Sequence, residues 1–133
     1  SLDAGSNVNK ITNYYHFKRN QLSIVTGLTK QKDDGNPKID TINHYLSYWD
    51  KAAGKVDNGM IGVAVIFPAN EQVKLIDRAD HLLGLMDIDK NQTFTYYQGA
   101  AWNKSGSFNQ ESDWLKYLER YSRGVQTPLV VNY

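Results

Sequence analysis

The sequence contains no cysteine among its 133 residues. This absence excludes disulfide bonds, thiolate nucleophiles and zinc sites with cysteine ligands. An excess of one charge is also missing, because 15 basic and 14 acidic side chains leave a formal net charge of +1. A nucleic-acid partner requires a strongly basic surface, and a transmembrane helix requires about 18 or more consecutive apolar residues. The sequence has neither feature, so we expect no nucleic-acid partner and no membrane span.

Motifs of several common enzyme classes are missing as well. The sequence has no phosphate-binding glycine loop and no nucleophile elbow. Its three histidines lack the His-x-His and His-x-x-x-His spacings of metal sites. Asp87-x-Asp89-x-Asn91 imitates the start of a calcium loop. However, Gln92 and Gln98 stand where that loop needs glycine and glutamate, so we predict no metal and no cofactor.

Most of the chain has the composition of β-strands. Segments rich in valine, isoleucine, threonine and tyrosine alternate with turn residues, which favours strands. The predicted strands cover residues 6–17, 22–28, 39–49, 60–67, 73–88, 92–102 and 129–133. The most apolar of them, 60–67, is predicted to be a central strand that is covered on both faces. Trp114, Leu118, Tyr121 and Val125 instead follow helical spacing. We therefore predict one mainly β domain over residues 1–133, an antiparallel β-sandwich with a C-terminal α-helix near 110–124.

The strongest candidate site lies on the last two predicted strands before the helix. If these strands form a hairpin, His81 faces Ala100, and one face carries a histidine, a glutamine and two aromatic rings. These residues are His81, Gln98, Tyr96 and Trp102. Aromatic rings stack on the apolar face of a pyranose while polar groups bind its hydroxyls, so the set is typical of a sugar site. The alternative is a buried face whose polar atoms are hydrogen-bonded internally.

Two other aromatic residues are candidates for the lining of a groove. Trp49 alternates with Tyr45 and Asn43 along a predicted strand, so the rings share a face. Cross-strand packing explains them equally well. Trp114 lies on the helical stripe and is predicted to anchor the helix in the core.

Short motifs along most of the chain are similar to those of one protein family. They are Leu2-Asp3-Ala4-Gly5-Ser6, Val8-Asn9-Lys10-Ile11, Asp80-His81-Leu82-Leu83, Tyr96-Tyr97-Gln98-Gly99-Ala100-Ala101-Trp102, Trp114-Leu115 and Pro128-Leu129. Together they resemble the C-terminal portion of bacterial domain-of-unknown-function family 4861. The resemblance implies a fold similar to the galactose mutarotase-like and polysaccharide-lyase-like β-sandwiches. Members occur in Gram-negative degraders of polysaccharides, which implies a carbohydrate ligand and a periplasmic or extracellular location.

The resemblance also implies that the chain is the C-terminal part of a longer β-sandwich module. Part of a sandwich would expose sheet edges and apolar faces that must be paired or covered. We therefore expect either a missing N-terminal half of the domain as the partner or a homo-oligomer.

The sequence leaves an enzyme, a binding domain and a purely structural module open. An enzyme would be a polysaccharide lyase or a glycoside-processing protein that acts on uronic-acid glycans. His81 would then transfer the proton, and Tyr97 or Tyr96 would assist. The substrate-binding residues would be Trp102, Gln98, Trp49 and Tyr45. In a non-catalytic glycan-binding or scaffolding domain the same aromatic residues bind and His81 only packs, so the surroundings of His81 separate the two hypotheses.

Overall fold

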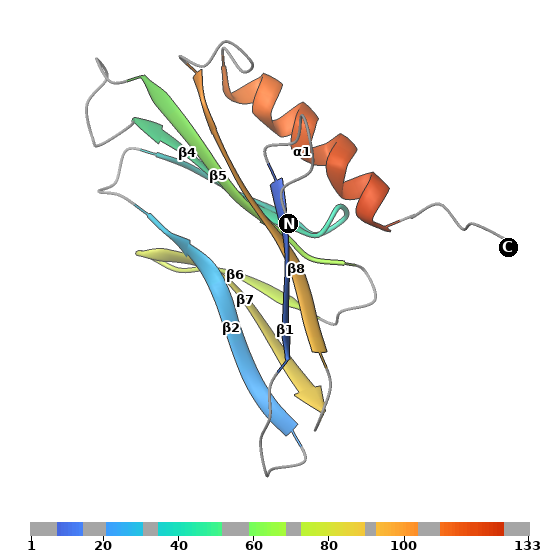
Figure 1. Ribbon diagram of the computed structural model, residues 1–133. Helices are drawn as coiled ribbons and strands as arrows, with labels where there is room; N and C mark the ends of the chain where they lie inside the picture. Colours follow the sequence, from blue (N-terminus) through green and yellow to red (C-terminus); the bar gives the residue numbers. More distant parts are fainter. Residues whose placement is uncertain are drawn as a thin grey trace, which may run out of the picture.

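The computed structural model contains two antiparallel β-sheets and one α-helix (Figure 1). It describes residues 8–14, 21–30, 35–51, 59–68, 73–89, 93–103 and 110–126. The elements are β1 Val8–Tyr14, β2 Gln21–Thr29, β3 Asn36–Asp40, β4 Tyr45–Lys51, β5 Met60–Ile66, β6 Lys74–Asp77, β7 His81–Asp89, β8 Thr93–Trp102 and α1 Glu111–Gln126. One sheet has the strand order β1-β8-β5-β4-β3 and the other has the order β2-β7-β6. The predicted fold class, mainly β and antiparallel with a C-terminal helix, is confirmed.

The two sheets bury a shared inner core. Its residues alternate along their strands, because successive side chains of a strand point to opposite faces. The three-stranded sheet contributes Ile24, Leu28, Leu82, Met86 and Ile88, and the five-stranded sheet contributes Leu46, Tyr48, Val65 and Phe94. The inner face of the five-stranded sheet is the face that carries these four residues.

Helix α1 covers the opposite face of the five-stranded sheet (Figure 1). Trp114 and Leu118 are fully buried there against β4 and β5. The indole Nε1 of Trp114 donates a hydrogen bond to Oγ of Ser47 over 3.2 Å. The core position predicted for Trp114 is therefore confirmed. In the described residues, no helix is long and apolar enough to cross a membrane.

The most apolar segment forms β5, which lies between β4 and β8 at the centre of its sheet. It was expected to be covered on both faces, and its side chains do enter both cores. Val65 belongs to the inner core, whereas Ala64 and Ile66 pack with the helix. A strand with two covered faces needs apolar residues at consecutive positions, which explains its composition.

The predicted hairpin between residues 73–88 and 92–102 is wrong. β7 pairs with β2 and β6, whereas β8 pairs with β1 and β5. The consecutive strands β7 and β8 thus belong to opposite sheets, and Ile88 of β7 and Phe94 of β8 both contribute to the inner core. The first predicted arm is itself a tight hairpin of β6 and β7, closed where the Arg78 N–H donates to the His81 carbonyl over 2.8 Å.

The single strand predicted over 39–49 is also wrong, because a turn divides it into β3 and β4. The Asp40 carboxylate organises this turn by accepting hydrogen bonds from the N–H groups of Ile42 and Asn43 over 3.0 and 2.8 Å. His44 then adopts a left-handed backbone conformation with φ of 60°. An aspartate that accepts from the backbone two and three residues later favours a turn over a strand. The strand predicted over 129–133 lies outside the described residues.

Candidate functional site

Three of the predicted site residues share one face of β8. Tyr96 packs against the inner core and its ring centre lies 5.5 Å from that of Phe94. Alternation then places Gln98 and Trp102 on the same face. Gln98 is exposed, and 45% of the Trp102 surface is accessible to solvent. The inner face is therefore buried at Phe94 and open to solvent towards Trp102.

The uncovered part of this face forms a narrow surface that we call the open strip. It consists of Asn9, Gln98, Ala100 and Trp102, all of which are exposed. Asn9 of β1 lies opposite Gln98 in the antiparallel register. Gln98 and Trp102 are four residues apart along β8, a distance of ~13 Å. The small side chain of Ala100 lies between them, so the surface is shallow at this point. Amide groups lie at one end of the shallow region and the indole ring lies at the other.

A buried carboxylate lies two strands away from the open strip on the same face. Asp50 of β4 pairs with Ile61 of β5, which in turn pairs with Trp102. Asp50 is only 1% exposed. Its Oδ2 accepts a hydrogen bond from the Tyr48 hydroxyl over 2.8 Å, and its Oδ1 accepts one from the Lys51 N–H over 2.7 Å. Sequence reasoning missed this pair, although Tyr-x-Asp spacing on a strand places both side chains on one face.

His81 lies away from the open strip. It belongs to β7 in the other sheet, where it pairs with Thr29 and is exposed. Alternation correctly grouped His81 with Leu83 and Leu85, but this is the outer face of the three-stranded sheet and not the face of Trp102. The arrangement assumed for a His81-centred site is therefore wrong. Proton transfer by His81 stays a prediction, but the aromatic and amide residues expected beside His81 lie on the five-stranded sheet.

The remaining predicted residues lie on the helix side of the five-stranded sheet. Tyr97 packs edge-on against Tyr121 of the helix, with ring centres 5.9 Å apart. Tyr45 and Trp49 are 2% and 4% exposed within the same core. The groove predicted along these two rings is wrong, because α1 covers them. Their apolar surface stabilises the fold, and stacking on a sugar would require the helix to move.

Burial and hydrogen bonding change the acidity of two groups near the β3–β4 turn. Burial, together with the nearby charge of Asp40, raises the pKa of Tyr45 to about 12. Partial burial of Asp40 acts to raise its own pKa, but hydrogen bonds from Asn43 and Ile42 outweigh it and hold that pKa below the usual value. Both groups therefore keep their ordinary neutral-pH forms and act as structural elements.

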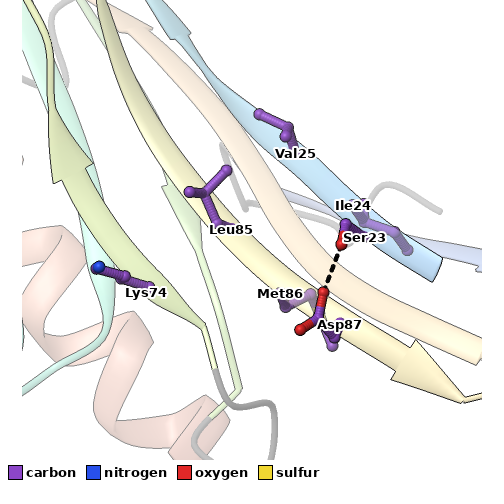
Figure 2. Close-up of a pocket in the computed structure, with 7 residues that line it drawn as sticks. All are labelled: Ser23, Ile24, Val25, Lys74, Leu85, Met86 and Asp87. Atoms are coloured by element: carbon purple, nitrogen blue, oxygen red, sulfur yellow. Dashed lines mark hydrogen bonds between the residues drawn. The ribbon is translucent and has the colours of Figure 1, made fainter. Parts of the chain in front are cut away.

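A separate hollow of about 370 Å³ lies over the three-stranded sheet (Figure 2). The residues that line it are Ser23, Ile24, Val25, Lys74, Leu85, Met86 and Asp87. The Ser23 hydroxyl donates a hydrogen bond to Asp87 Oδ1 over 2.6 Å. Val25 and Leu85 supply apolar surface, and Leu85 lies between Val25 and Lys74 in the cross-strand register. His81 is not among the lining residues, and no group of three or more potential metal ligands occurs in the described part of the chain.

Comparison with known proteins gives one family and one curated relative. Residues 1–131 match the family described as Domain of unknown function (DUF4861). The relative, Uncharacterized protein P7 of Formosa agariphila, is 27% identical over 139 residues, which cover 99% of this chain and 33% of the relative. The chain therefore spans about a third of the length of this relative. No solved structure matches the chain.

Proposed function

The chain belongs to the family described as Domain of unknown function (DUF4861), and from this starting point we propose that it binds carbohydrate and acts in polysaccharide breakdown. The binding site in this proposal is the open strip. A periplasmic or extracellular location, where polysaccharides are met, is part of the same proposal. The proposal assigns to this chain no activity or substrate of the whole relative, because the chain spans only about a third of the relative's length.

The observation that carries the proposal is the exposed indole of Trp102 in line with the exposed amide of Gln98. A large aromatic ring normally buries most of its surface, so an indole with 45% exposure supports a contact role. The Gln98 and Asn9 side chains each offer amide donors and an acceptor to sugar hydroxyls. Ala100 lets a flat ligand approach the sheet between these groups.

The geometry favours a binding role over catalysis by His81. His81 is exposed on the other sheet, outside the hollow and away from the open strip. A catalytic histidine is expected in a cleft beside the groups that hold the substrate. The proposed role is therefore glycan binding within a polysaccharide-degrading system, and turnover of uronic-acid glycans remains the second candidate.

Titration with oligosaccharides tests the binding role. The probes are saturated and unsaturated uronic-acid oligosaccharides and neutral oligosaccharides of equal length, followed by calorimetry and tryptophan fluorescence. We expect at least one probe to bind and Trp102→Ala to weaken it tenfold or more, which corresponds to about 1.4 kcal/mol. Trp102→Phe keeps a ring and should retain part of the affinity. Gln98→Ala should weaken binding less than Trp102→Ala.

Two controls separate this site from its alternatives. Ile42→Ala removes an apolar side chain that is 85% exposed in the β3–β4 turn, and it should leave binding unchanged. His81→Ala should also leave binding unchanged. Binding that survives Trp102→Ala would refute the open strip as the site. If the wild-type chain releases products from a probe and His81→Ala does not, the catalytic candidate would be established instead.

A further inference from the structure

The described part of the chain has four edge strands, β1, β2, β3 and β6, which differ in how they are protected against pairing with another chain. Natural edge strands are blunted by charge, by proline or by short length, since an unpaired edge offers its backbone to other strands. β1 carries Lys10 at its third position, and β3 carries Pro37 and Lys38. β6 has four residues, which include Lys74 and Asp77. Three of the four edges therefore carry recognised protective features.

β2 has none of these protective features. Its nine residues, QLSIVTGLT, contain no charged side chain and no proline. It pairs with β7 without interruption from Gln21 opposite Asp89 to Thr29 opposite His81, so no bulge bends it. Within the described part of the chain, no strand pairs with its other edge. Val25 at its centre is 58% exposed. An uninterrupted and uncharged edge of ~30 Å, which contains several β-branched residues, is therefore available for pairing.

We propose that β2 pairs with β2 of a second copy of this chain, antiparallel across a two-fold axis at Val25. In this register Val25 lies against Val25 of the second copy, and Ser23 lies against Gly27. No charged residue of β2 meets its own copy, because the strand carries none. The pairing joins the two three-stranded sheets into one sheet of six strands.

The two-fold arrangement also ends the assembly at two copies. Antiparallel pairing of β2 with itself uses both β2 edges at once, so the contact is isologous and closed. The joined sheet then ends at β6 in each copy, which is short and charged. The edges of the other sheet, β1 and β3, keep their lysine and proline residues. No unprotected edge remains in the described residues, so fibre growth is not expected.

In the same register, the β7 residues that flank the paired strands bring no like charges together. Asp89 and His81 lie at opposite ends of β7, opposite Gln21 and Thr29 of β2 respectively. In the two-fold pair, Gln21 lies against Thr29 of the second copy. The row that begins at Asp89 therefore ends at His81 of the second copy, three strand spacings or about 14 Å away, so it brings no like charges together.

Sedimentation of the 133-residue chain tests the pairing. An interface of one strand from each copy is small. We therefore expect the dimer to dissociate as the protein concentration is lowered from about 200 to about 1 µM. Val25→Lys places two ammonium groups together at the axis and should weaken association at least tenfold. The Val25 side chain is mostly exposed in the unpaired chain, so the variant should fold normally. Ile42→Lys is the matched control and should leave association unchanged, because Ile42 is 85% exposed in the β3–β4 turn, which belongs to the other sheet.

Amide hydrogen exchange provides a second, independent reading. In a single copy only alternate amides of β2 bond to β7, whereas pairing on both edges protects consecutive amides. We expect consecutive protection at high concentration and alternate protection in Val25→Lys. A monomer over the whole range, equal weakening by both lysine variants, or a dimer with alternate protection in β2 would each refute the proposal. None of these readings depends on whether the open strip binds sugar.

Discussion

Tyr45 shows how packing changes the chemistry of a single side chain. Its hydroxyl lies beside Asp40, and its ring is covered by the helix-side core. Burial and the neighbouring carboxylate both disfavour the phenolate, so the pKa rises from 10.0 to about 12. In the unfolded chain the hydroxyl regains the ordinary value. The difference links the stability of the fold to alkaline pH.

We expect Tyr45→Phe to flatten the loss of stability at high pH. Because the folded pKa is the higher one, the contribution of Tyr45 is complete below the unfolded pKa of 10.0 and declines as pH rises towards 12. Wild type should therefore lose up to about 1.4 kcal/mol per pH unit relative to Tyr45→Phe in this window. Urea unfolding of both proteins at several values from pH 8 to pH 11 measures the difference. Parallel stability profiles would contradict the assigned acidity.

The contact between α1 and the five-stranded sheet depends on a close fit at one position, Gly62. Gly62 of β5 lies beneath the Trp114 ring, and a Cβ at this position would come within 2.7 Å of Trp114 Nε1. The same Cβ would lie 2.8 Å from Cε3 of Trp49. Neither ring has room to retreat, because both are buried. The absence of a side chain at Gly62 therefore sets how closely the helix approaches.

Two glycine-to-alanine substitutions test this contact, because one is expected to lower the free energy of unfolding and the other to raise it. Gly62→Ala should lower the free energy of unfolding by ~1–3 kcal/mol through overpacking under the helix. Gly124→Ala in α1 meets no atom within 4 Å, and it should raise stability by up to ~1 kcal/mol through helix propensity. Urea unfolding followed by circular dichroism gives both values. Equal effects of the two substitutions would show that the space beneath Trp114 is not limiting.

The elements also show which features the sequence can predict. Alternation assigned Tyr96, Gln98 and Trp102 to one face of β8, and the apolar run of β5 indicated a central strand. Alternation does not identify the partner of a strand, however. β7 has one apolar face, and that face is buried equally well in a hairpin with β8 or in the opposite sheet. The partner is decided by contacts between distant segments, so the site around His81 could not be predicted correctly.

At the scale of the whole molecule, two cores share the strands that separate them. Leu46 of β4 faces the inner core, while the adjacent Tyr45 faces the helix. Val65 and Ala64 of β5 divide in the same way. Loss of either core would expose one face of strands whose other face is still buried. The described elements should therefore unfold together.

Two buried leucines, one from each core, test this cooperativity. Leu82 lies in the inner core, Leu118 lies on the buried face of the helix α1, and both are fully buried. Replacement by alanine should cost about 2–5 kcal/mol at either position, whereas Ile42→Ala at an exposed position should cost almost nothing. We expect each leucine variant to shift the helix signal in circular dichroism and the tryptophan fluorescence by the same amount. A Leu118→Ala transition that appears only in the helix signal would mean that α1 can leave while the sheets stay folded. The strands β4 and β5 argue against that result, because departure of the helix would expose Tyr45, Trp49 and Ile66 on strands that still carry the inner core.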